Sequence, residues 1–291
     1  MDLLDTLLDP WRSGIDRRAL LEVTLLGIAC GALSFWIVAF RLSYPAESLA
    51  HGLLPGLVVA ALLGIPLLVG AGAGVGVATA AVALAARDER IGADTATAVV
   101  VTGMFGLGAL LALSPDAPAR LGDLLFGDPL GVTDTDLAAA AGLIAVGGPL
   151  LLALHRPLCA VAFDPGTACS LGISAGLARA AVLGLLATAL AVAVQGLGTL
   201  LVLAVLIAPA AAVGRHARSP GRAMGASAAI AVGAGIVGIY ASAGLGTAAG
   251  ASVALVLCLS VALSVVARRL GRGGRRRVWL AQAGRAFDGE P

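Results

Sequence analysis

Lysine is absent from this sequence, and all nineteen of its basic residues are arginine. This absence excludes a P-loop, whose GxxxxGK[ST] motif needs a lysine to reach the nucleotide phosphates. It also excludes chemistry that begins with a lysine Schiff base. If ATP drives this protein, a separate subunit must hydrolyse that ATP.

Charged residues of every kind are scarce. They make up 12% of the chain, against 59% hydrophobic residues. The mean hydropathy of +0.99 is far above that of soluble proteins. We therefore expect a membrane protein that does not bind nucleic acid.

Aromatic residues are also few, at 4%, whereas glycine occurs forty times. Small residues four apart let membrane helices approach closely, and we expect Gly72 and Gly76 to do so. The four cysteines lack the CxxC spacing of zinc and redox sites, so we interpret them as packing residues. They are Cys30, Cys159, Cys169 and Cys258.

Apolar segments of about 20 residues recur along the chain, each long enough for one membrane helix. The pattern predicts an all-α, polytopic membrane protein with nine spans, and eight is the nearest alternative. The predicted spans are Leu20–Phe40, Tyr44–Leu63, Leu67–Ala86, Thr95–Leu113, Leu137–Leu154, Arg179–Gln195, Thr199–Val213, Ala223–Tyr240 and Thr247–Val266. Residues 1–19 form an N-terminal segment, 20–267 the membrane domain and 268–291 a basic tail.

Arginine placement predicts the orientation. Six arginines between Arg268 and Arg277 follow the last span, so we expect the C-terminus to be cytoplasmic. The segment from Ser114 to Asp136 carries five aspartates and one arginine, and the count of spans places it outside. The same count places the N-terminus outside with three arginines, Arg12, Arg17 and Arg18, which the positive-inside rule disfavours. Either the first segment is a half-helix, or these arginines are tolerated because four aspartates balance them: Asp2, Asp5, Asp9 and Asp16.

Glu47 and His51 lie four residues apart at the start of the second predicted span. On a helix they share one face about 6 Å apart, where a carboxylate and an imidazole can bind one divalent cation together. Pro45 and Pro55 bracket the pair, and we expect them to break the helix and free carbonyls for coordination. The alternatives are that His51 is a hydrogen-bonded packing residue and that Glu47 caps the span.

A short helix is predicted between the fifth and sixth spans, near 164–172. Asp164 suits the N-cap, Pro165 the first helical position, and Gly172 the position just past the end. On the cytoplasmic face, such a helix could transmit force from a peripheral partner. The alternative is an ordinary interfacial connector.

Two further polar residues lie near predicted spans. Asp94 precedes Thr95 and suits an N-cap better than a metal ligand. Gln195 lies in the short break between the sixth and seventh spans, where it either lines a pathway or satisfies backbone groups. Asp94 and Gln195 are therefore both predicted as possible residues of a transport pathway.

Five stretches, in order along nearly the whole chain, resemble the zinc/manganese/iron ABC transporter permease family. They are RLSYPAESLAHGLLPG (Arg41 to Gly56), DTA (Asp94 to Ala96), LGDLLFG (Leu121 to Gly127), FDPGTACSLG (Phe163 to Gly172) and QGLGTLLVLAVLIAPA (Gln195 to Ala210). Glu47 stands where the family pattern has Asp, which keeps the oxygen ligand but lengthens its arm by one methylene. Ala46 replaces the family's glycine.

The resemblance implies an ABC importer permease architecture without ATPase activity of its own. It implies a metal site at Glu47 and His51, and coupling to a cytoplasmic ATP-binding subunit through Phe163, Asp164, Pro165, Leu171 and Gly172. It further implies pairing of two permease copies and delivery of zinc, manganese or iron by an extracytoplasmic metal-binding protein. The metal is then cargo, and no permanently bound cofactor is expected.

The expected location is the plasma (inner) membrane of a bacterium, and the basic tail could bind anionic lipid. Two other classes stay open at this point. An ion-coupled secondary transporter would use Glu47 and His51 as a proton or cation relay. A passive membrane scaffold would need neither residue.

Overall fold

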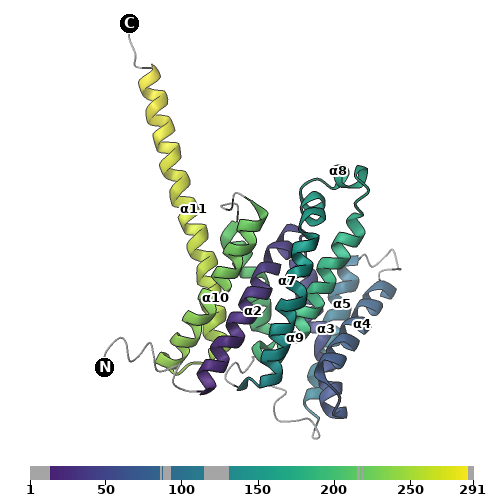
Figure 1. Ribbon diagram of the computed structural model, residues 1–291. Helices are drawn as coiled ribbons and strands as arrows, with labels where there is room; N and C mark the ends of the chain where they lie inside the picture. The colour runs from purple at the N-terminus through teal and green to yellow at the C-terminus, as the bar shows by residue number, and fades with distance from the viewer. Residues whose placement is uncertain are drawn as a thin grey trace.

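The computed structural model describes residues 14–85, 87, 93–114, 131–214, 217 and 219–287, and all of the regular structure in these ranges is helical. The helices are α2 (Gly14–Ala39), α3 (Ser43–Leu63), α4 (Leu67–Ala85), α5 (Ala93–Ala112), α7 (Asp134–Phe163), α8 (Pro165–Ser170), α9 (Ala175–Val213), α10 (Pro220–Leu245) and α11 (Ala249–Phe287). Eight of them are long and apolar enough to cross a membrane. Figure 1 shows these eight as a bundle, with α8 at one end of it. The all-α, multi-span prediction is confirmed.

The long helix α9 folds back on itself at Gly198, where φ is 70° and ψ is 163°. It begins at Ala175, four residues after the α8 C-cap Leu171. At its other end, Gly214 lines the same cavity as Phe163, the last residue of α7. Both ends of α9 therefore lie on the face that carries α8, and the helix forms a hairpin with arms 175–197 and 199–213. With these two arms, eight spanning helices make nine crossings.

Two faces of the bundle follow from this path. The α8 face holds α8 and both ends of α9, and the opposite face holds the α9 reversal and the starts of α2 and α7 (Figure 1). At the α8 face, the Arg268 side chain of α11 donates to the Ala211 carbonyl at 3.1 Å. From there α11 continues to Phe287 beyond the rest of the bundle (Figure 1).

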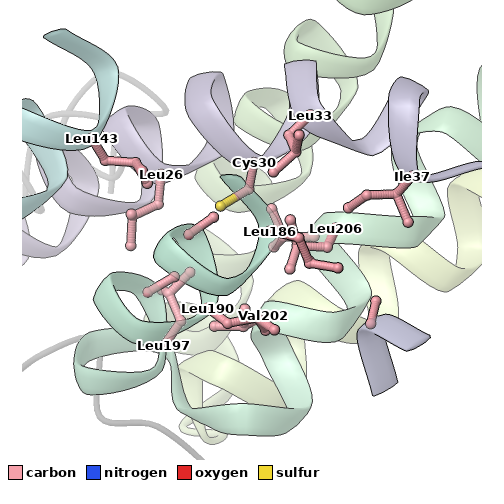
Figure 2. Packing of buried hydrophobic residues seen from close by; sticks show 14 of the residues in the cluster. Leu26, Cys30, Leu33, Ile37, Leu143, Leu186, Leu190, Leu197, Val202 and Leu206 are labelled. Carbon is pink, nitrogen blue, oxygen red and sulfur yellow. The ribbon is translucent and has the colours of Figure 1, made fainter. Parts of the chain in front are cut away.

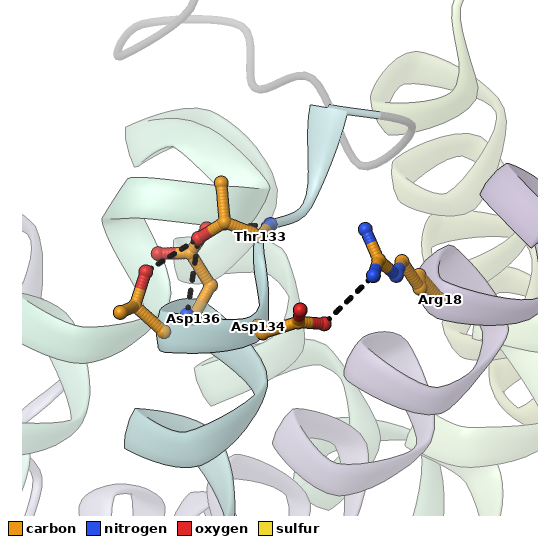
Figure 3. Close-up of polar contacts among 5 residues, drawn as sticks. Arg18, Thr133, Asp134 and Asp136 are labelled. Atoms are coloured by element: carbon orange, nitrogen blue, oxygen red, sulfur yellow. Dashed lines mark hydrogen bonds and ion pairs between the residues drawn. The ribbon is translucent and has the colours of Figure 1, made fainter.

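The start of α2 carries arginine at the face opposite α8, and the structure shows what balances it. Arg18 forms an ion pair with Asp134 at the start of α7, with 2.9 Å between nitrogen and oxygen (Figure 3). Thr133 caps α7 by accepting a hydrogen bond from the Asp136 N–H, and Asp136 accepts one from the Thr133 N–H in return. The acidic first turn of α7 thus lies beside Arg18 of α2. Arg12 lies outside the described residues.

The core is built from α2, both arms of α9, and the helices packed around them (Figure 2). Cys30 lies fully buried among these side chains and contributes packing, as expected. Cys159 is half-buried, whereas Cys169 and Cys258 are exposed, so the interpretation of all four cysteines as packing residues is wrong for these two. An added Cβ at Gly31 would lie 2.8 Å from the Ala228 Cα, so glycine lets α2 and α10 approach closely.

Glycines of α4 do pack closely against a neighbouring helix, as expected, but they are not the two glycines that we predicted. A Cβ at Gly70 would lie 2.3 Å from the Gly56 carbonyl oxygen, and Gly74 also faces α3, whereas Gly72 and Gly76 face open space. The reason is rotation: both pairs have the same spacing, but only the face with Gly70 and Gly74 meets α3.

Candidate functional site

Helix α3 carries both predicted metal ligands. The chain turns sharply into it through Arg41, which has a positive φ of 56°, and leaves it at Gly64 in the left-handed conformation. The helix is continuous from Ser43 to Leu63. The expected break at Pro45 and Pro55 is therefore wrong. Pro45 lies in the first turn, where backbone N–H groups have no intrahelical partner in any case, and tertiary packing holds the helix through Pro55.

Pro55 still affects the site, although the helix passes through it. In an α-helix the N–H of residue 55 donates to the carbonyl of residue 51. Proline has no N–H, so the His51 carbonyl lacks this donor. The residue that carries the imidazole therefore also has a backbone oxygen without its usual i+4 donor.

Glu47 is exposed and His51 half-buried on α3. The His51 ring meets Phe105 of α5 edge to face, with 5.1 Å between ring centroids. This contact limits rotation of the imidazole. The pair is therefore presented on an accessible side of α3, and its histidine is held by a neighbouring helix.

The Glu47 and His51 pair alone would fill only part of a metal ion's coordination sphere. Within the described ranges, no group of three His, Cys, Asp or Glu side chains lies close enough to hold a metal ion. Glu47 and His51 provide one oxygen and one nitrogen donor group, which suits manganese, iron and zinc alike. A metal ion at this pair would need further ligands from water, backbone carbonyls or another molecule.

A cavity of about 500 Å³ opens beside α3. Tyr44 and Ser48 of α3 line it on one side, and Thr79 of α4 and Thr97 of α5 line it on the other. The first arm of α9 closes it at Leu183. Polar side chains on the helix that carries Glu47 and His51 therefore border a space between α3, α4, α5 and α9.

The predicted short helix is present as α8, and its ends are built as the sequence indicated. Asp164 is the N-cap and accepts hydrogen bonds from the Thr167 N–H at 3.1 Å and from the Thr167 hydroxyl at 2.5 Å. These two bonds lower the pKa of Asp164 below its ordinary value, because they favour the ionised form. Pro165 occupies the first helical position, and Gly172 has a φ of 76° just past the end.

Two large apolar side chains, one at each end of α8, are exposed on the surface of the protein. Phe163 is 71% exposed and Leu171 is 69% exposed, whereas Ala168 between them is fully buried. Phe163 also borders a cavity of about 310 Å³ with Phe35 of α2 and Pro220 of α10. The short helix thus rests on the bundle through Ala168 and presents apolar groups outward at both ends.

The family model described as the ABC 3 transport family matches residues 15–268. The chain belongs to this family. It is 32% identical over 71% of its length to a probable iron transport system membrane protein of Haemophilus influenzae, of which it covers 76%. It is 28% identical over 82% of its length to the manganese import system permease protein ScaB of Streptococcus parasanguinis, of which it covers 85%.

A solved structure, PsaBC from Streptococcus pneumoniae in complex with Fab, has the same fold. The TM-score is 0.84 at 25% identity, over 90% of this chain and 95% of that one. The structural match confirms the predicted ABC permease architecture, and the family match confirms the resemblance drawn from the sequence motifs. The LGDLLFG stretch, residues 121–127, lies outside the described residues.

The two possible pathway residues of this ABC 3 family member lie on α5 and α9, whereas Glu47 and His51 lie on α3. Helix α5 begins at Ala93, so Asp94 lies within its first turn and is not the N-cap; its side chain is outside the described part. The Gln195 amide donates to the Ala191 carbonyl of its own helix at 2.9 Å. Gln195 therefore satisfies a backbone group just before the α9 reversal.

Sequence reasoning missed a buried acidic residue, Glu22 of α2. It is 1% exposed. A Cβ atom added to Gly196 of α9 would lie only 2.0 Å from the Oε1 atom of Glu22. The sequence did contain an indication of this residue, because Glu22 is an acidic residue inside an apolar run. Burying an ionisable group in a membrane segment costs free energy, and such groups usually have a function.

Proposed function

We propose that this chain is the permease subunit of an ATP-driven importer of a divalent transition metal: manganese, iron or zinc. The observation that carries the proposal is the Glu47 and His51 pair on one accessible side of α3. The family match and the iron and manganese relatives support metal as the cargo. The chain moves the ion and makes or breaks no covalent bond.

Two copies of the chain complete the metal site. Each copy contributes one carboxylate and one imidazole, and two copies give four side-chain ligands for one ion. Exposure of Glu47 in a single chain fits this arrangement, because a carboxylate that faces a second copy is open until that copy is present. The site holds the ion transiently, because a fully closed site would retain its cargo.

A separate cytoplasmic ATP-binding subunit docks on α8. Phe163 and Leu171 supply apolar contact on either side of the helix, and the cap at Asp164 fixes its start. Since α8 leads directly into α9, closure of the ATP-binding subunits would move the first arm of the hairpin. The absence of lysine from the whole chain agrees with an ATPase site on another subunit.

The α8 face is then cytoplasmic, as is the end of α11, and the face with the α9 reversal is external. An extracytoplasmic metal-binding protein delivers the ion to that external face. The location is the inner membrane of a bacterium, where the arginine-rich segment after the last span can contact anionic lipid.

The shared site is tested by metal-binding stoichiometry. Purified permease in detergent is titrated with Mn²⁺, and the free ion is followed by electron paramagnetic resonance. We expect one ion bound per two chains, no binding in His51→Ala, and unchanged binding in His155→Ala, because His155 packs on Trp36 and Cys159 instead. One ion per chain, or full binding by His51→Ala, would contradict the proposal.

A further inference from the structure

Glu22 is a carboxylic acid sealed inside the membrane part of the bundle. Its side chain is 1% exposed, and its Oε2 atom has no hydrogen-bond partner among the described residues. Placing an ionised carboxylate in such surroundings without a counter-ion is very costly. Its position therefore demands either a cation or a proton.

The carboxyl group rests directly on the backbone of the α9 reversal. A Cβ at Gly196 would lie 2.0 Å from Oε1 and 2.6 Å from Oε2, so only glycine fits between the two elements. Two residues later Gly198 reverses the chain. A helix end leaves carbonyl groups without an intrahelical donor, and Glu22 is packed against such an end.

No cation faces Glu22 among the described residues. On α2, Arg17 and Arg18 are exposed nearer the helix start, and Arg18 is paired with Asp134. On α7, the nearest charges at this face are the carboxylates Asp134 and Asp136 of the first turn, which are not cations. The remaining titratable groups on the helices packed against α2 are Arg179 of α9 and Arg222 of α10 near the α8 face, Tyr44, Glu47 and His51 of α3, His155, Arg156 and Cys159 in the last three turns of α7, and Tyr240 of α10. The surroundings favour the neutral acid.

We propose that Glu22 binds a proton and, as the neutral acid, donates a hydrogen bond to a backbone carbonyl of the α9 reversal, which holds the far end of the hairpin. Loss of the proton removes this donor and sets a negative charge against carbonyl oxygens. Glu22 is thus a positioning residue, and the α2–α9 contact is sensitive to pH.

The position of the contact connects it to transport. The first arm of α9 begins directly after α8 and ends at Gly196 to Gly198, beside Glu22. A displacement of α8 is transmitted along this arm to the reversal. With Glu22 protonated, the reversal is fixed to α2; with Glu22 ionised, that fixation is lost. This second step rests on the proposed function, whereas the proton-dependent contact does not.

The contact is tested on the purified permease alone, by thermal unfolding between about pH 5 and about pH 9, a range that covers documented buried glutamic acids. We expect the Tm of the wild type to fall by several degrees relative to Glu22→Gln as pH rises. Glutamine keeps a donor and cannot ionise, and each pH unit above the ionisation point lowers the protonated fraction about tenfold. The matched control is Asp134→Asn, an exposed carboxylate at the same face, whose Tm should follow the wild type.

Parallel Tm profiles for the wild type and Glu22→Gln would overturn the proposal. A second measurement needs no variant to fold: infrared spectra of the wild type should show the C=O stretch of a protonated carboxyl at neutral pH that disappears at alkaline pH. Absence of that band would also overturn it.

The transport step is tested separately, by ATP-dependent Mn²⁺ uptake into liposomes containing the permease and its ATP-binding partner. Uptake by the wild type should decline as pH rises, and uptake by Glu22→Gln should stay flat. Equal pH profiles would contradict the role of Glu22 in transport. Absence of uptake from every sample, with the Tm result intact, would instead count against the proposed function.

Discussion

The backbone N–H of Ala210, in the second arm of α9, donates a buried hydrogen bond of 3.1 Å to the Ser34 hydroxyl of α2. This bond lies near the α8 face, and the Glu22 contact lies near the opposite face. Helix α2 therefore contacts the α9 hairpin at two places: Ser34 contacts the second arm, and Glu22 contacts the reversal.

Replacing Ser34 by alanine should destabilise the permease. The Ala210 N–H would lose the Ser34 hydroxyl as an acceptor, and hydrogen bonds between membrane helices contribute roughly 0.6 to 1.7 kcal/mol. Thermal unfolding in detergent measures the loss. Ser170→Ala is the control, because Ser170 is exposed on α8 and bonds only to its own helix. Equal Tm values for the two variants would contradict the assigned role of the bond.

Gly198→Ala should be strongly destabilising, because φ 70° and ψ 163° suit glycine almost alone. We expect a loss of about 1–3 kcal/mol from strain at this position. Gly225→Ala is the matched control: Gly225 lies inside α10 and faces open space, so alanine should be neutral or slightly stabilising there. Both are compared by thermal unfolding, and a tolerated Gly198→Ala would mean that the hairpin does not turn there.

Gly196→Ala should displace Glu22, since the new methyl group would lie within 2.6 Å of both carboxyl oxygens. Overpacking of this kind costs about 1–3 kcal/mol. The double variant with Glu22→Ala should recover much of that loss, because the methyl group then fills the space vacated by the carboxyl. A double-mutant cycle in thermal stability measures the coupling, and additive effects would show that the two residues do not meet.

The cap of α8 should make subunit docking depend on pH. The pKa of Asp164 lies below its ordinary value because Thr167 hydrogen-bonds to the ionised form. The cap is therefore complete above the ordinary carboxyl range and is lost as pH falls through the lowered pKa. We expect binding of the ATP-binding subunit, followed by surface plasmon resonance, to weaken in acid for the wild type.

Two variants separate the charge of this cap from its shape. Asp164→Asn retains a good N-cap that cannot titrate, so its binding should not vary over the acid range. Asp164→Ala removes the cap and should bind weakly at every pH. An acid-dependent loss of binding in Asp164→Asn that matches the wild type would place the titrating group elsewhere.

Much of the fold could be predicted because it depends on local chemistry. Span lengths follow from bilayer thickness, and the break at 195–199 marked the α9 reversal. Asp164, Pro165 and Gly172 act within one turn of α8, so their roles were readable from sequence. Gly70 and Gly74 were missed in favour of Gly72 and Gly76 because rotation about a nearly uniformly apolar helix depends on its neighbours.

The site could be predicted only in part for the same reason. The spacing of Glu47 and His51 is a property of one helix, and α3 places them as expected. Contacts between distant segments, such as Phe105 against His51 or Gly196 against Glu22, have no local signal.

The most direct test of the account is ATP-dependent uptake of Mn²⁺, Fe²⁺ and Zn²⁺ into liposomes that contain the permease and its ATP-binding subunit, supplied with the external binding protein. We predict uptake of at least one of these ions that requires ATP, is abolished by His51→Ala, is strongly reduced by Glu47→Gln, and is retained by His155→Ala. Uptake that persists without ATP, or that His51→Ala leaves unchanged, would contradict the account.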